Sequence, residues 1–155
     1  MDKIKILIAN DIESRINEIK EFIIDKFNDL DILEASSYKD TLKYLTYKKF
    51  DCIILDITMP TYYNQEKFSL ESGTFRSLAG LNILERMYLD KLHIPTILFT
   101  GLEKFYNEYN FLLSFKQLTK NVEKYSFCKG IIRDNGEQIL WQKEMQELLN
   151  NIIRK

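Results

Sequence analysis

Two aspartates in this sequence, Asp11 and Asp56, each stand at the end of a short apolar segment. A third apolar segment ends in the hydroxyl of Thr100. Converging carboxylate and hydroxyl oxygens suit Mg²⁺, which is usually held by one or two carboxylates together with phosphate oxygens and water. A carboxylate can also attack a phosphoryl group to form an acyl phosphate, while a metal neutralises the charge on the transferring group. These residues therefore suit a divalent-metal site, and a carboxylate at such a site has the chemistry to accept a phosphoryl group.

A plainer interpretation exists for an aspartate that follows a strand, because such a residue is often the N-cap of the next helix. For Asp11 both interpretations stay open, the helix N-cap and the metal ligand. The cap interpretation is weaker for Asp56, because Pro60 and a long polar loop at residues 61–79 follow it. Taken together, the two aspartates favour a site.

The elements that would position these residues follow from the periodicity of apolar side chains. Apolar, β-branched runs predict strands at residues 3–9, 31–35, 52–55, 94–100 and 127–132. Apolar residues at three- and four-residue steps predict helices at residues 12–30, at 38–49, from about 80, at 103–121 and across 140–152. This alternation predicts an α/β fold, a doubly wound five-stranded parallel sheet with helices on both faces. Ligands gather at the carboxyl ends of such strands, where Asp11, Asp56 and Thr100 are expected.

Composition narrows the function classes. The 155 residues carry a net charge of -1, which argues against direct nucleic-acid binding, and no apolar run is long enough to span a membrane. Cys52 and Cys128 lie in apolar segments, which predicts reduced thiols and a cytoplasmic protein. A single histidine, His93, excludes a site built on two imidazoles. The sequence contains no Gly-rich phosphate loop of the Gly-Lys-Ser/Thr type.

Four segments of the sequence resemble the response regulator receiver domains of two-component signalling, in their stand-alone chemotaxis-type form. They are the apolar opening with its polar pair at residues 6–13, the segment 50–60 that ends in Asp-Ile-Thr-Met-Pro, the helix start at 80–84, and the segment 96–101. The resemblance covers residues 1–155 as a single domain, except for the insertion loop at about 61–79. It implies the flavodoxin-like strand order 2-1-3-4-5.

The resemblance also implies a role for each matching residue. Asp56 would accept the phosphoryl group and ligate Mg²⁺ together with Asp11 and the backbone carbonyl of Thr58. Asn10 occupies the first acidic position of the family, which acts on the metal through water. Thr100 would hydrogen-bond a phosphoryl oxygen and move toward it on phosphorylation.

The sequence departs from the family pattern at two places. Asn10 is a neutral amide where the family has a carboxylate, so we expect weaker metal binding. The family ends its fifth strand with a Lys followed by Pro. Here Arg133 and Lys129 compete for that position, Arg133 is favoured because 131–132 continue the strand, and no Pro follows either residue. Both residues can equally be read as solvated cations that flank a strand.

The function implied is a phosphoacceptor switch in a two-component phosphorelay. Its donor would be a histidine kinase or histidine phosphotransfer protein, its target an unidentified protein, and its own enzymatic activity at most self-phosphorylation and slow autodephosphorylation. The alternative is a degenerate receiver that binds partners independently of phosphorylation. A haloacid-dehalogenase phosphatase is less well matched, because that family has a second Asp where Thr58 stands. The aromatic residues of the loop at 61–79 predict a lid over Asp56 or a partner-binding surface.

Overall fold

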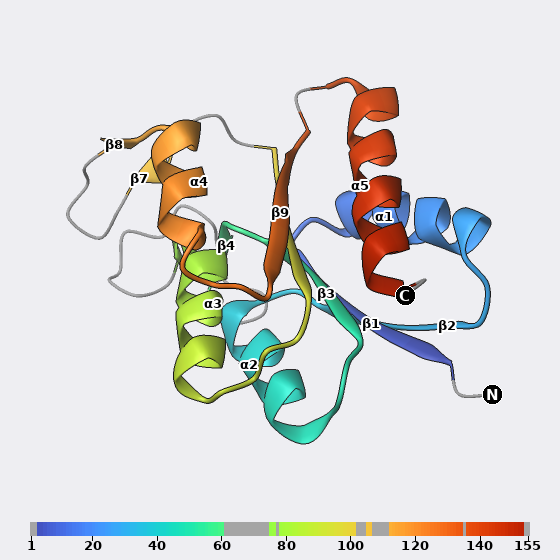
Figure 1. Ribbon diagram of the computed structural model, residues 1–155, viewed down its shortest axis with the longest axis horizontal. Helices are drawn as coiled ribbons and strands as arrows, with labels where there is room; N and C mark the ends of the chain where they lie inside the picture. The colour runs from blue at the N-terminus through green and yellow to red at the C-terminus, as the bar shows by residue number, and fades with distance from the viewer. Residues whose placement is uncertain are drawn as a thin grey trace.

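The computed structural model describes residues 3–60, 75–76, 78–101, 105–106, 112–134 and 136–153. Its centre is a five-stranded sheet in the order β2-β1-β3-β6-β9, and every pairing in it is parallel (Figure 1). The strands are β1 (Ile4–Ala9), β2 (Leu30–Ala35), β3 (Cys52–Asp56), β6 (Thr96–Thr100) and β9 (Cys128–Arg133). Counted in chain order these five strands run 2-1-3-4-5, which confirms the predicted fold class.

The central strands are apolar along their whole length because helices cover both sides of them. All five residues of β3 and all five of β6 are buried, whereas the edge strands β2 and β9 are only partly buried. A polar side chain at the end of β3 or β6 is therefore held by a rigid, buried backbone, which is a favourable setting for a functional group.

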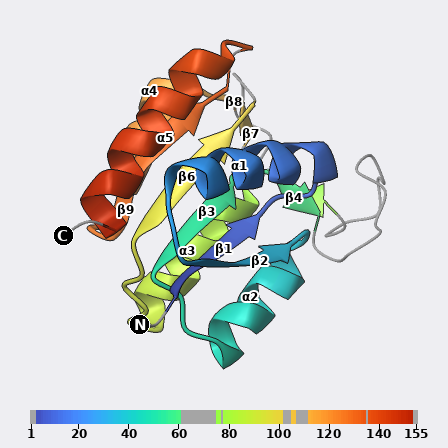
Figure 2. The ribbon, with the colours of Figure 1, turned by 90° about the vertical axis from the view of Figure 1, so that its right-hand side faces the viewer.

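Helices pack on both faces of the sheet, as predicted. One face carries α1 (Glu13–Lys26) and α5 (Gln138–Ile153), and the other carries α2 (Tyr38–Tyr47), α3 (Ala79–Leu89) and α4 (Phe115–Val122) (Figures 1 and 2). Trp141 of α5 is buried on the first face, where its ring lies edge-on against Phe22 of α1 and Phe99 of β6. This aromatic contact joins α1 and α5 to the central strands.

Two predicted helices were too long. The helix predicted at 12–30 ends at Lys26, since Phe27 is extended, Asp29 has a φ of 58°, and Leu30 already belongs to β2. The helix predicted at 103–121 is wrong at the described residues before Ser114. Residues Phe105–Tyr106 (β7) and Leu112–Leu113 (β8) pair as short antiparallel strands. A capping box then fixes the start of α4, because Ser114 and Gln117 satisfy each other's backbone N–H groups.

The segment predicted as a long loop at 61–79 is framed by a short hairpin. Met59–Pro60 (β4) pairs antiparallel with Phe75–Arg76 (β5) directly after the third main strand. Residues 61–74 and 77 lie outside the described residues, so the predicted lid and the single domain over 1–155 stay predictions. Among the described helices, none combines the length and apolarity needed to cross a membrane.

Candidate functional site

The predicted site residues lie at the carboxyl ends of adjacent parallel strands. Asp56 is the last residue of β3 and pairs in register with Phe99, one residue before Thr100 at the end of β6. Asp11 follows β1, whose last residue is paired with the residue before Asp56. Thr100 is in turn paired with Arg133, the last residue of β9. Sheet register thus places these four residues along one edge, where the sequence predicted Asp11, Asp56 and Thr100.

Asp56 is a buried carboxyl with a small opening to solvent, since 9% of the residue is exposed. Its Oδ1 accepts a hydrogen bond from the backbone N–H of Thr58 at 3.3 Å. Burial, and then the negative charge of Asp11, raises the pKa of Asp56 to about 8, although the amides of Thr58 and Ile57 and the charge of Arg15 act in the opposite direction. The two carboxylates therefore repel each other in a poorly solvated place, and a bound cation would relieve that repulsion.

The structure of the turn after β1 shows whether Asp11 is the N-cap of the helix that follows. The N-cap of α1 is Ile12 and not Asp11, and the Ile12 side chain makes no capping hydrogen bond. Asn10 is instead the residue that orders the turn, because its buried side-chain Oδ1 accepts a hydrogen bond from the N–H of Ile12 at 2.9 Å. The cap interpretation of Asp11 is wrong, and its carboxylate remains a candidate metal ligand.

The donor set at this edge fits Mg²⁺. Within the described residues there is no cluster of three or more His, Cys, Asp or Glu side chains that could hold a metal. The edge offers two carboxylates, the amide of Asn10, the backbone oxygen of Thr58 and the hydroxyl of Thr100, all hard oxygen donors. Mg²⁺ is commonly bound by one or two carboxylates and completes its shell with water and phosphate oxygens. Zn²⁺ would instead favour a site with Cys or His ligands.

The two candidate cations of the fifth main strand lie at opposite ends of it. Lys129 is exposed near the amino end, where its Nζ donates to the carbonyl of Ser126 at 3.2 Å. Arg133 is at the carboxyl end opposite Thr100, and its guanidinium carbon lies 4.8 Å from the centre of the Phe115 ring. Of the two, only Arg133 is placed at the edge that holds Asp56.

Gly80 allows the start of α3 to pack closely against the backbone of Asp56, a role that its sequence context did not indicate. Its N–H donates to the carbonyl of Ile57 at 2.8 Å, which brings the first turn of α3 against the end of β3. A Cβ on Gly80 would lie 2.7 Å from the backbone oxygen of Asp56 and 2.9 Å from the Cα of Ile57. The absence of a side chain at position 80 is therefore a condition for the observed position of the Asp56 backbone.

Gly80→Ala is accordingly expected to lower the free energy of unfolding by about 1–3 kcal/mol, because two backbone segments must move to admit the methyl group. Chemical denaturation of the wild type and the variant measures this difference. Gly101→Ala is the matched control, since the nearest atom to a Cβ there is Nη2 of Arg15 at 3.4 Å, which is an ordinary van der Waals contact. Equal stability of the two variants would show that the close approach of α3 to Asp56 is not tightly packed.

Comparison with known proteins places this geometry in context. No protein-family model matches the sequence. The Detocs response regulatory protein DtcB of Enterobacter cloacae (strain JD6301) is 31% identical over 144 residues, which cover 91% of this chain and 95% of the relative. The signal receiver domain of an HD domain-containing protein from Pseudomonas fluorescens Pf-5 superposes with a TM-score of 0.66 at 13% identity, covering 98% of this chain and 95% of the other. The chemotaxis response regulator CheY4 of Vibrio cholerae gives 0.63 at 14% identity, covering 94% and 98%.

Proposed function

This chain belongs to the response regulator receiver family, and from that premise we propose that it is a phosphoacceptor switch that receives a phosphoryl group on Asp56 with Mg²⁺ bound beside it. The observation that carries the proposal is the state of Asp56 itself. It is the only Asp or Glu that is buried among the described residues, it ends a central strand, and it lies within electrostatic reach of Asp11. A fold accepts such a costly arrangement chiefly where function requires it.

The residues around Asp56 would bind Mg²⁺ and contact the phosphoryl group. Asp11, Asp56 and the backbone carbonyl of Thr58 would hold Mg²⁺, with Asn10 acting through water. When bound, Mg²⁺ supplies positive charge to the phosphoryl group and relieves the repulsion between the two carboxylates. Thr100 would donate its hydroxyl to a phosphoryl oxygen, and Arg133 would contribute a positive charge from the last position of β9.

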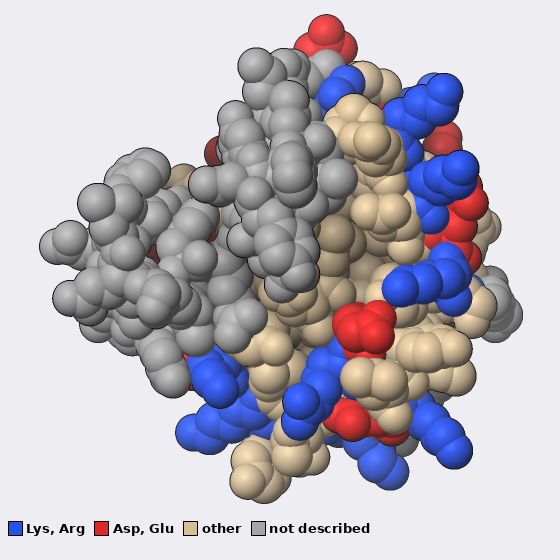
Figure 3. All heavy atoms as spheres, turned by 90° about the vertical axis from the view of Figure 1, so that its left-hand side faces the viewer, with Lys and Arg blue, Asp and Glu red and all other residues tan. Residues whose placement is uncertain are grey.

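The phosphoryl donor would be a phosphohistidine on a histidine kinase or a histidine phosphotransfer protein, and the output would be a contact with another protein. A hollow of about 440 Å³ lies between α4 and β9, and its lining includes Phe115, Thr119, Val122, Tyr125 and Ile131. On the side of the molecule that carries α3 and α4, the described residues form an uncharged strip bordered by side chains of both charges (Figure 3). Because Phe115 contacts Arg133 and also lines this hollow, a response of Arg133 to phosphorylation would reach the hollow directly.

Metal removal tests this function. Incubated with acetyl phosphate and Mg²⁺, the wild-type protein is expected to gain one phosphoryl group per chain in intact-mass analysis. In EDTA the rate should fall by about 100-fold or more, because the charge on the transferring group is then left without its counter-ion.

The outcomes of that experiment separate the two functions considered for the sequence. A gain of one phosphoryl group that depends on Mg²⁺ supports the switch. No gain at any Mg²⁺ concentration, with the protein folded, would contradict the switch and would favour the phosphorylation-independent interaction module.

A further inference from the structure

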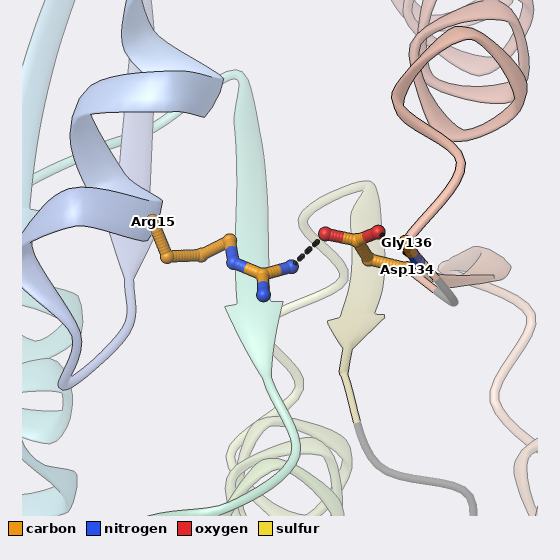
Figure 4. A network of polar contacts seen from close by, with 3 residues as sticks. All are labelled: Arg15, Asp134 and Gly136. Atoms are coloured by element: carbon orange, nitrogen blue, oxygen red, sulfur yellow. Dashed lines mark hydrogen bonds and ion pairs between the residues drawn. The ribbon is translucent and has the colours of Figure 1, made fainter.

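The cation Arg15, on helix α1, lies close to this site. Arg15 lies in the first turns of α1, and its side chain extends toward the connection that follows β9 (Figure 4). Its Nη1 lies 2.5 Å from Oδ2 of Asp134, and the pair is partly buried, with side-chain exposures of 23% and 12%. A guanidinium that is partly buried and held at one end by a carboxylate is well ordered, so its position at this edge is defined.

The surroundings of Arg15 place its charge beside the proposed phosphoacceptor. The guanidinium carbon lies 5.3 Å from the centre of the Phe99 ring, and Phe99 is the residue paired in register with Asp56. Nη2 is 3.4 Å from the point where a Cβ of Gly101 would stand, directly after Thr100. The charge of Arg15 also lowers the pKa of Asp56, against the larger opposing effects of burial and Asp11. Arg15 is therefore an electrostatic neighbour of Asp56.

Arg133, the residue proposed for the position of the family's lysine, makes a different kind of contact. Its guanidinium lies over the Phe115 ring on the side of the sheet that carries α4. Such a contact between a guanidinium and an aromatic face is itself stabilising, so Arg133 would have to give it up in order to bind a phosphoryl group. Arg15 would only need to exchange one anionic partner for another.

We propose that Arg15 binds the phosphoryl group on Asp56, and that Asp134 is a positioning residue that holds Arg15 ready for it. This inference rests on the proposed phosphorylation of Asp56. In the reaction with acetyl phosphate, an Asp56 carboxylate oxygen forms a bond to phosphorus while the bond from phosphorus to the acetate oxygen breaks. Acetate leaves with that electron pair, and no proton is transferred. Two N–H groups of the Arg15 fork can donate to two phosphoryl oxygens, a geometry that a lysine cannot provide.

The same contacts connect the phosphoryl group to the start of α5. The N–H of Asp134 donates to the carbonyl of Thr100 at 2.8 Å, and its Oδ1 accepts a hydrogen bond from the N–H of Gly136 at 3.0 Å. Asp134 therefore orders the connection between β9 and α5 while its other oxygen holds Arg15. When Arg15 turns to the phosphoryl group, Asp134 loses its ion pair, and the connection to α5 is the part of the fold that responds.

The decisive variant is Arg15→Gln, which keeps hydrogen-bonding capacity and removes the charge. With acetyl phosphate and saturating Mg²⁺, its phosphorylation rate is expected to fall about tenfold or more, because one preorganised charge donor is lost. Lys20→Gln is the matched control, since Lys20 is also on α1 and also pairs with a carboxylate, Glu34, at 2.9 Å. That control should phosphorylate at the wild-type rate.

A binding measurement separates this role from a structural one. By calorimetry at saturating Mg²⁺, Arg15→Gln should bind beryllium trifluoride, a phosphoryl analogue, about tenfold more weakly than the wild type. Its affinity for Mg²⁺ alone should stay the same or rise, because a repelling cation has been removed. Loss of folding would weaken both affinities. Arg15→Lys should recover part of the affinity for the analogue, and Asp134→Asn should weaken it less than Arg15→Gln.

Each result bears on a different claim. Phosphorylation of the wild type with no loss in Arg15→Gln overturns this inference and leaves the proposed function standing. A larger loss in Arg133→Gln than in Arg15→Gln also overturns it and assigns the role to Arg133. A folded wild type that gains no phosphoryl group and binds no beryllium trifluoride overturns both the function and the inference.

Discussion

Replacing Asp56 by Asn is expected to stabilise the protein while it abolishes phosphorylation. At pH 7 the free energy of unfolding should rise on the order of 2–4 kcal/mol, which corresponds to an increase in melting temperature of about 5–10 °C for a chain of this size. The reason is that burial and the charge of Asp11 disfavour the ionised form of the Asp56 carboxyl. The amide of Asn carries no charge, and its oxygen can still accept the hydrogen bond from Thr58.

The pH dependence of this effect follows from the sign of the pKa shift. The pKa of Asp56 is raised on folding, to about 8, so the folded state holds the proton more tightly than the unfolded state. The wild type therefore loses stability as the pH rises from about 4 to about 8, and Asp56→Asn does not incur this loss. The difference between the two proteins should be small at pH 4 and reach its full size near pH 8.

Thermal or urea denaturation of both proteins in EDTA, repeated across this pH range, measures the difference in their free energies of unfolding. Asp51→Asn is the matched control, because Asp51 is exposed near the opposite end of β3, where its side chain accepts a hydrogen bond from the N–H of Lys5. Its stability should stay within about 0.5 kcal/mol of the wild type. A less stable Asp56→Asn variant would mean that the carboxylate makes favourable contacts which outweigh the cost of its burial. That result would contradict the prediction that the ionised Asp56 carboxylate destabilises the folded protein.

Asp11→Asn is expected to weaken Mg²⁺ binding by about 30–100-fold, because it removes one of two carboxylates from a poorly solvated site. The phosphorylation rate at subsaturating Mg²⁺ should fall in the same proportion. The substitution also removes the charge that repels Asp56, so the protein without metal should become slightly more stable. Weaker metal binding together with equal or greater stability is a combination that a misfolded variant would not produce.

The fluorescence of Trp141 offers a direct titration for that prediction. Trp141 is the only tryptophan of the sequence, and its ring centroid lies 5.3 Å from that of Phe99, the residue paired with Asp56. The reciprocal variant Asn10→Asp restores the charge that the family has at this position and keeps an acceptor for the N–H of Ile12. It should tighten Mg²⁺ binding several-fold. Unchanged Mg²⁺ affinity in both variants would place the metal elsewhere.

Much of the fold followed from the sequence because each central strand is a short apolar run that ends in a polar residue. The run that ends at Asp56 is buried on both sides, and such runs have few alternatives to a central parallel strand. The region before α4 was predicted less well. Aromatic and apolar residues between 103 and 113 fit a helical period as readily as a short hairpin. The cap at Ser114, which decides where the helix starts, is a local signal that the longer period obscured.

In the candidate site, too, some residues could be predicted from the sequence and others could not. Asp11, Asp56 and Thr100 could be predicted because each stands where a strand ends, and strand ends in one parallel sheet share an edge. Arg15 could not, because in the sequence it is one of several alternating charges on the outer side of a helix. Its partner Asp134 is 119 residues away, and only the folded sheet brings the two together. The signal available was its spacing of four residues from Asp11, about one helical turn beyond a candidate ligand.

Chemical trapping of the modified residue tests most directly whether Asp56 is the phosphoacceptor. After reaction with acetyl phosphate and Mg²⁺, reduction with borohydride converts an aspartyl phosphate into homoserine, and peptide mass spectrometry then identifies its position. We expect homoserine at position 56, in the wild type only when both Mg²⁺ and the phosphoryl donor were present. Homoserine at another aspartate, or at none in a protein that is folded and saturated with Mg²⁺, would contradict the assignment of Asp56.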